Sequence, residues 1–174
     1  MSPDDAKRIV RAQAGDVQAF EQVLRAIEPQ LHGYINRLVS ARPITDDILQ
    51  ETFLRMWRGL GWLRDPMLFR PWAYRIATNE ARRALGRENL REETRADESE
   101  LGTLQANFID PARRLDAARC LAQVSPLARV VLVAHYYEGL SLEDVGAVTG
   151  APLGTVKSRL ASGLTQLRAL MGPP

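Results

Sequence analysis

The stretch SLEDVGAVTGAPLGTVKSRL at residues 141–160 predicts two short helices that flank a tight turn. Ser141 suits the N-cap of the first helix, and Asp144 follows three positions later in the capping turn. Gly150 provides the positive φ that the turn requires, and Pro152 suits the first turn of the second helix. This order of caps and breakers is typical of a helix-turn-helix, whose second helix fits the major groove of DNA.

The second of these helices is expected to have an apolar side and a basic side. Its apolar residues recur at helical spacing and predict a buried stripe formed by Val156, Leu160, Leu164, Leu167 and Met171. The only charges after Asp144 are those of Lys157, Arg159 and Arg168. Residues 161–166 carry no charge, and Gly163 is expected to weaken the helix by about 1 kcal/mol relative to alanine. We therefore expect a modest affinity for the DNA backbone.

The composition places the chain among ordinary globular proteins. It has 174 residues, a net charge of +2 and 45% hydrophobic residues, enough for one domain or two small ones. One cysteine and two histidines allow no intramolecular disulfide and no usual zinc cluster, so we expect no metal and no cofactor. The polar N-terminus lacks a secretory signal, and no apolar run is long enough to span a membrane, which predicts a cytoplasmic protein without membrane insertion.

The pattern along the chain predicts an all-α fold with two small helical domains. Apolar residues recur at helical spacing before and after Pro29, and they predict two amphipathic helices there. A third helix is expected from Thr45 to the glycines at 59 and 61, and a fourth after the cap-and-proline pair at 65–66. These helices form the predicted N-terminal bundle, residues 1–87.

The second domain is expected to follow an acidic linker. Periodicity is lost over residues 88–109, where acids outnumber arginines, and this predicts a flexible linker that lets the domains close on each other or spread apart. Asp-Pro at 110–111 and Ser-Pro at 125–126 then begin new helices. We expect about four helices over residues 110–174, and the apolar run around 130–133 is interpreted as a buried helix.

The sequence offers little for catalysis. It contains no glycine-rich phosphate loop, nucleophile elbow or HExxH motif. Asp46 and Asp47 are adjacent in a predicted helix and point to different faces, so they are poorly placed to act on one substrate. His135 and Cys120 both lie in apolar runs, where packing explains them better than chemistry. We therefore expect a protein that is not an enzyme.

Aromatic and basic residues are concentrated together between residues 53 and 87, where arginines can neutralise phosphates and exposed rings can stack on unpaired bases. Trp57 and Trp72 occur at helical spacing, so packing in the core explains them better than stacking on bases. Trp62 lies in a loop flanked by glycine and is the better candidate for an exposed ring.

Three motifs, in order, resemble those of bacterial sigma factors of the extracytoplasmic-function group. DDILQETFLRMWR at 46–58 is similar to the segment with which that family holds the polymerase clamp helices. FRPWAYRIATNEAR at 69–82 resembles its segment for recognising and melting the −10 element. YYEGLSLEDV at 136–145 and GTVKSR at 154–159 resemble its reader of the −35 element.

The resemblance implies a role for each motif. Core RNA polymerase would be bound by Asp46, Asp47, Gln50, Glu51, Phe53, Arg55 and Trp57. The −10 element of promoter DNA would be bound by Trp62, Phe69, Arg75, Asn79, Arg82 and Arg83. The −35 element would be bound by Thr155, Lys157, Ser158 and Arg159, without an assignment to bases or phosphates. An anti-sigma protein is a further partner that the resemblance implies.

A second class of function stays open from the residues alone. The same helix-turn-helix would serve a stand-alone transcriptional regulator whose N-terminal bundle acts as a sensor. Such a regulator would need a ligand pocket and would be expected to bind its operator as a dimer. The two N-terminal motifs favour the sigma factor, because a helix-turn-helix of this kind also occurs in the output domains of response regulators.

Overall fold

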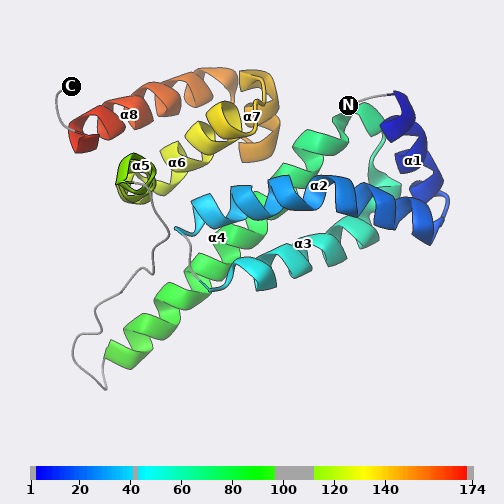
Figure 1. The fold of residues 1–174 in the computed structure, drawn as a ribbon, viewed down its shortest axis with the longest axis horizontal. Helices are drawn as coiled ribbons and strands as arrows, with labels where there is room; N and C mark the ends of the chain where they lie inside the picture. The colour runs from blue at the N-terminus through cyan, green and yellow to red at the C-terminus, as the bar shows by residue number, and fades with distance from the viewer. Residues whose placement is uncertain (1–2, 41–42, 97–111, 172–174) are drawn as a thin grey trace.

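The computed structural model describes residues 3–40, 43–96 and 112–171, and all regular elements in these ranges are helical (Figure 1). The N-terminal unit contains α1 (Pro3–Gln13), α2 (Val17–Leu38), α3 (Thr45–Gly59), the 3₁₀ turns η1 (Leu60–Trp62) and η2 (Pro66–Leu68), and α4 (Phe69–Ala96). The C-terminal unit contains α5 (Ala112–Gln123), α6 (Pro126–Leu132), the π-helical turn η3 (Val133–Tyr137), α7 (Leu142–Thr149) and α8 (Leu153–Met171). The predicted all-α fold is confirmed.

One helix, α2, replaces the two that the sequence predicted on either side of Pro29. The prediction of a break was wrong because a proline removes a single backbone donor, whereas α2 buries one continuous apolar face. Val23 and Ile27 before the proline and Leu31 and Tyr34 after it are all buried, while Pro29 itself is exposed. Burial of this shared face outweighs the local cost of the proline.

Helix α1 was not predicted, because its sequence is mostly polar. Only Ile9 and Ala12 are buried, and α1 packs with them against α2. Its last residue, Gln13, donates from Nε2 to the backbone carbonyls of Leu60 at 3.1 Å and Leu63 at 2.7 Å. Helix α1 thereby fixes both sides of the turn that carries Trp62.

Part of the segment that the sequence predicted as a flexible linker is helical. Helix α4 continues to Ala96, so the first part of the segment 88–109 is helical rather than irregular. The remainder of that segment lies outside the described residues. Figure 1 shows α4 as a long diagonal helix that extends well beyond α2 and α3.

The helix-turn-helix has the predicted caps. Ser141 Oγ accepts a hydrogen bond from the backbone N–H of Asp144 at 3.0 Å, and Gly150 has φ of +68°. On α8, Val156 is fully buried, but the predicted stripe is exposed progressively toward the C-terminus, and Met171 is 62% exposed. The prediction that Met171 is buried was therefore wrong.

Gly163 has a packing role that helix propensity did not reveal. A Cβ at this position would lie 2.9 Å from Leu132 Cδ1 and 3.2 Å from Ala128 Cβ. Such distances are shorter than van der Waals contact, so glycine allows α8 to lie close against α6. The close packing of α8 on α6 therefore offsets the lower helix propensity of glycine.

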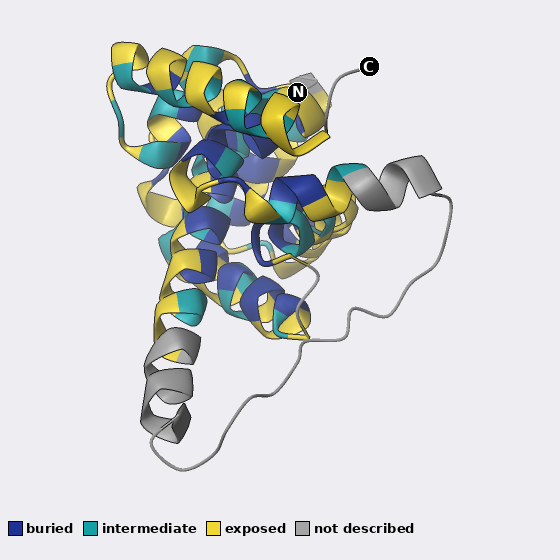
Figure 2. Cartoon of the chain, turned by 90° about the vertical axis from the view of Figure 1, so that its left-hand side faces the viewer, coloured by how far each residue is buried: buried dark blue, intermediate teal, exposed yellow. Residues whose placement is uncertain are grey.

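The two units pack against each other and share a continuous buried core. Helix α7 lies against α4, and η3, α5 and α6 contact α2. Buried residues run through the middle of the molecule where these helices meet (Figure 2). Arg129 of α6 adds a polar connection, because its Nη1 donates to Leu38 O and to Ser40 Oγ, each at 2.9 Å.

Candidate nucleic-acid and polymerase interfaces

The start of α8 presents the residues that the sequence assigned to the −35 element. Lys157 and Ser158 are exposed, and Thr155 and Arg159 are half-buried. Ser158 Oγ donates to the carbonyl of Thr155 at 3.0 Å, which leaves its lone pairs available to a donor from outside. The arrangement gives one positive and polar surface at the N-terminal end of a helix.

The turn before α4 presents an exposed indole ring. Trp62 is 87% exposed, as its position between glycine and leucine in a short turn predicted. The following turn is fixed by Asp65, whose Oδ1 accepts from the backbone N–H of Met67 at 2.8 Å. Met67 and Leu68 are also more than half exposed. This loop therefore offers an apolar surface beside a polar helix.

One face of α4 carries the polar residues assigned to the −10 element. Arg75, Asn79, Arg82 and Arg83 are all exposed, at positions that recur with the helical period. Phe69, in contrast, is 4% exposed and packs in the core with its ring centroid 5.8 Å from that of Trp72. Its burial removes Phe69 from the surface on which the sequence had placed it.

Helix α3 carries the residues assigned to the polymerase. Those at its exposed side are Asp46, Asp47, Gln50, Arg55 and Trp57, whereas Glu51 and Phe53 are half-buried. Trp57 is 43% exposed, and its ring centroid lies 4.8 Å from that of Phe20, so it serves both the surface and the packing against α2. The acids at the first turn also suit the positive end of the helix dipole.

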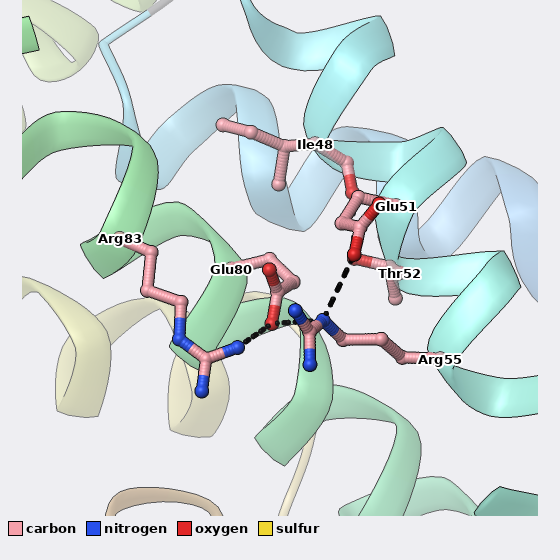
Figure 3. Close-up of polar contacts among 6 residues, drawn as sticks. All are labelled: Ile48, Glu51, Thr52, Arg55, Glu80 and Arg83. Atoms are coloured by element: carbon pink, nitrogen blue, oxygen red, sulfur yellow. Dashed lines mark hydrogen bonds and ion pairs between the residues drawn. The ribbon is translucent and has the colours of Figure 1, made fainter. Parts of the chain in front are cut away.

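A groove of about 270 Å³ lies between α3 and α4 next to these residues. It is lined by Ile44, Asp47, Ile48, Glu51, Glu80, Ala84 and Arg87. Glu80 is 3% exposed, and its Oε1 contacts Arg55 Nε at 2.8 Å and Arg83 Nη1 at 2.7 Å (Figure 3). No role was predicted for Glu80 from the sequence, although its place between the buried Ala77 and Ala81 on α4 was a usable signal.

A second buried carboxylate lies between the two units. Glu138, at the end of η3, is 8% exposed, and its Oε2 accepts from the Tyr74 hydroxyl at 2.6 Å. Arg70 donates to the backbone carbonyl of Glu138 at 2.9 Å, and Arg37 Nη1 lies 3.9 Å from its Oε1. Burial, and then the hydrogen bond to the Glu138 carboxylate, raise the pKa of Tyr74 well above its ordinary value, so its hydroxyl stays protonated and donates.

The described residues contain neither a cluster of metal-ligating side chains nor a membrane-spanning helix. No group of three or more histidine, cysteine, aspartate or glutamate residues is placed to hold a metal ion. No helix in these ranges has the length and apolar character needed to cross a membrane.

Comparisons with known proteins match both halves of the chain to one family. Residues 23–91 match the family described as Sigma-70 region 2, and residues 120–169 match Sigma-70, region 4. RNA polymerase sigma factor CarQ of Myxococcus xanthus is 31% identical over 93% of this chain and 94% of its own length. The ECF RNA polymerase sigma-E factor of Haemophilus influenzae is 28% identical over 90% of this chain and 89% of its own.

A solved structure has the same fold. The sigma factor RpoE of Bartonella quintana, determined in complex with the anti-sigma factor NepR, has a TM-score of 0.74 and 23% identity. It covers 87% of this chain and 96% of its own. With region 2 on the N-terminal unit and region 4 on the helix-turn-helix unit, the chain belongs to the two-domain, extracytoplasmic-function RNA polymerase sigma factors.

Proposed function

We propose that this sigma factor divides promoter recognition and polymerase binding among three separate surfaces. Helix α3 binds core RNA polymerase, the Trp62 turn and α4 bind the opened −10 element, and the start of α8 binds the −35 element. The observation that carries the proposal is the Trp62 ring, which is 87% exposed and precedes the polar face of α4. Together with Met67 and Leu68, which are also more than half exposed, Trp62 forms an apolar patch of the kind that marks an interaction site.

The proposal gives the −10 surface a mixed chemistry. An unpaired base stacks on Trp62 or enters beside it, while Arg75, Arg82 and Arg83 neutralise phosphates and Asn79 reads a base edge. Aromatic rings and arginines together suit a single strand better than duplex DNA. Phe69 has no place in this proposal, because it is buried.

At the −35 element, α8 enters the major groove with Thr155, Lys157, Ser158 and Arg159. If Arg159 reads a guanine, Arg159→Ala will lose about 1–3 kcal/mol of discrimination at one promoter position. A uniform loss across promoter sequences will instead assign Arg159 to a phosphate. Binding titrations on promoters with single-base changes at the −35 element measure this difference.

On α3, the exposed acids Asp46 and Asp47 pair with a basic surface of the polymerase, where charge complementarity sets association rate and register. Asp47→Arg is expected to abolish most core binding in a pull-down assay. Asp4→Arg, at a similarly exposed acid on α1, is the matched control and is expected to bind normally. Equal binding by both variants would refute the assignment of α3.

The protein acts in the cytoplasm as a binding factor rather than an enzyme, and an anti-sigma protein covers its binding surfaces when it is inactive. The family membership supports this part of the proposal. It also favours the sigma factor over a stand-alone regulator with an N-terminal sensor, because region 2 occupies the place of the supposed sensor.

One experiment tests the proposal as a whole. Purified protein is added to sigma-free core polymerase with genomic promoter fragments, and specific initiation is measured. We expect initiation from a subset of fragments and its loss in Trp62→Ala, but not in Val10→Ala, which truncates an exposed apolar residue of α1. Failure to initiate on every fragment would favour the regulator.

A further inference from the structure

Glu80 is a buried carboxylate that stands between two of the proposed binding surfaces. It projects from α4 toward α3, and its side chain is only 4% exposed. The same oxygen, Oε1, contacts one arginine from each helix: Arg55 of α3 at 2.8 Å and Arg83 of α4 at 2.7 Å. Figure 3 shows the two guanidinium groups approaching this carboxylate from opposite sides.

Each of the two arginines contacts Glu80 through one nitrogen, while much of its side chain is exposed to solvent. The side chain of Arg55 is 43% exposed, and that of Arg83 is 54% exposed. Arg55 Nε also lies 3.1 Å from Glu51 Oε1, while Arg83 uses one Nη on Glu80. A guanidinium has five N–H donors, and each arginine makes these contacts through one nitrogen only, so most donors remain for a phosphate or carboxylate from another molecule.

We propose that Glu80 is a positioning residue that holds Arg55 ready for the polymerase and Arg83 ready for promoter DNA. The inference rests on the proposed function, which places Arg55 on the polymerase surface and Arg83 on the −10 surface. It adds to that function a residue that touches neither partner. The shared oxygen makes the two arginines parts of one electrostatic unit across the α3–α4 contact.

The physical basis is preorganisation. A free arginine has a large rotamer entropy, and binding a partner restricts it. Contact with a buried carboxylate fixes the guanidinium before the partner arrives, so less entropy is lost on binding. Glu80 is itself well suited to this, because its position inside the helix contact restrains its own rotamer.

The adjacent Arg82 provides a natural comparison. It is exposed on the same helix, and it forms no hydrogen bond or ion pair with another described residue. The proposal therefore predicts that DNA binding through Arg83 depends on Glu80, whereas DNA binding through Arg82 does not. Arg58 offers the same comparison on α3, since it is exposed and lacks the contact with Glu80 that Arg55 makes.

The test is a pair of double-mutant cycles in the complete protein. Glu80→Gln keeps the shape of the side chain and removes its charge, and it is combined with Arg83→Ala or with Arg82→Ala. Affinity of the reconstituted holoenzyme for a promoter with a pre-opened −10 region is measured. Glu80→Gln is expected to weaken this affinity about fivefold with Arg83 present and to have no such effect once Arg83 is alanine.

Two further measurements separate positioning from folding. Core polymerase affinity is measured in a second cycle, in which Glu80→Gln is expected to lose its effect in Arg55→Ala but to keep it in Arg58→Ala. Any general loss of stability caused by Glu80→Gln enters both members of each pair equally, so it cancels from the comparison. Glu80→Asp, which keeps the charge, is expected to restore part of the affinity.

The outcomes distinguish this inference from the function on which it rests. Equal effects of Glu80→Gln in the Arg82 and Arg83 backgrounds would overturn the positioning role, while Arg75→Ala would still report whether α4 binds DNA. If Arg75→Ala and Arg83→Ala both left promoter affinity unchanged, the −10 surface itself would be misassigned. Coupling confined to Arg83 and Arg55 supports Glu80 as the residue that holds both.

Discussion

Glu80 and Glu138 are the two charged residues buried in the described part of the chain, and they are held in opposite ways. Glu80 lies within the N-terminal unit and contacts two arginines at 2.7 and 2.8 Å. Glu138 lies between the units, its Oε2 accepts a hydrogen bond from the neutral Tyr74 hydroxyl at 2.6 Å, and its Oε1 lies 3.9 Å from Arg37 Nη1. A buried carboxylate must be paired with a cation or hydrogen-bonded. Glu80 is stabilised mainly by ion pairs, and Glu138 mainly by the hydrogen bond from Tyr74.

The partners of the two carboxylates explain their different consequences. The arginines on Glu80 are about half exposed, so they remain available to other molecules. Tyr74, on Glu138, is fully buried, and Arg70 is committed to the Glu138 carbonyl. Glu80 therefore lies behind the proposed binding surfaces, whereas Glu138 connects the C-terminal unit to α2 and α4.

The largest expected effect is that of Glu138→Ala. The truncation leaves the buried Tyr74 hydroxyl without its acceptor, so we expect the free energy of unfolding to fall by about 3 kcal/mol. Denaturant titration of the full chain measures this. Glu143→Ala, at an exposed acid of α7, is the control and should change stability by less than about 0.5 kcal/mol. Similar losses in both variants would mean that Glu138 does not hold the units together.

Glu80→Gln is expected to have a smaller effect on stability, about 1–2 kcal/mol, because its two arginines can be rehydrated where they are exposed. The same denaturant titration applies. A loss greater than that in Glu138→Ala would reverse the comparison and make Glu80 mainly a structural residue.

Arg37→Ala tests how much the ion pair with Glu138 contributes to stability. The Arg37 side chain is 39% exposed, and its guanidinium lies 3.9 Å from Glu138 Oε1 and 4.4 Å from the centroid of the Tyr137 ring. We expect a loss of about 1 kcal/mol or less, which decreases further when salt is raised. Thermal unfolding at low and high salt checks both points. A loss as large as that in Glu138→Ala would show that the ion pair, rather than Tyr74, holds this carboxylate.

Local sequence signals predicted where helices begin and end better than they predicted which charged residues are buried. The caps at Ser141 and Asp65 and the positive φ at Gly150 depend on neighbouring residues, and each was legible from the sequence. Tyr74 and Glu138 are 64 positions apart, so no periodicity within either helix could pair them. Phe69 shows the same limit, because a ring near a basic segment fits a base or a core equally well until its neighbours are known.

The exposure of a candidate site residue was predictable where it depends on the local turn alone. Trp62 lies in a short turn that has little room to bury an indole, and its exposure was expected. Glu80 was missed because a glutamate in a helix is normally solvated, and its pairing with Arg55 of α3 depends on a contact between helices that the local sequence does not reveal. Gly163 was assessed by helix propensity alone, whereas its role depends on the approach of α6.

The smallest expected effect concerns Asp16, a carboxylate near the surface that contrasts with both buried ones. Its Oδ1 accepts from the backbone N–H of Ala19 at 2.9 Å, and Arg11 Nη2 donates to its Oδ2 at 2.6 Å. The Ala19 hydrogen bond, and then Arg11, lower the pKa of Asp16 below its ordinary value. The resulting stabilisation is therefore present above the unfolded-state pKa, about 3.9, and is lost as the pH falls through the folded-state pKa.

Asp16→Asn separates capping from charge, because asparagine caps a helix about as well as aspartate. We expect the variant to be slightly less stable than the wild type at pH 7 and equally stable at a pH below the folded-state pKa of Asp16. Thermal unfolding at both pH values measures the difference, with Asp4→Asn on α1 as the exposed control. A deficit that persisted unchanged in acid would mean that the charge of Asp16 is not what stabilises the native state. Asp16 would then contribute through its hydrogen bonds rather than its charge, and it would differ from the two buried glutamates because only their charges are removed from water.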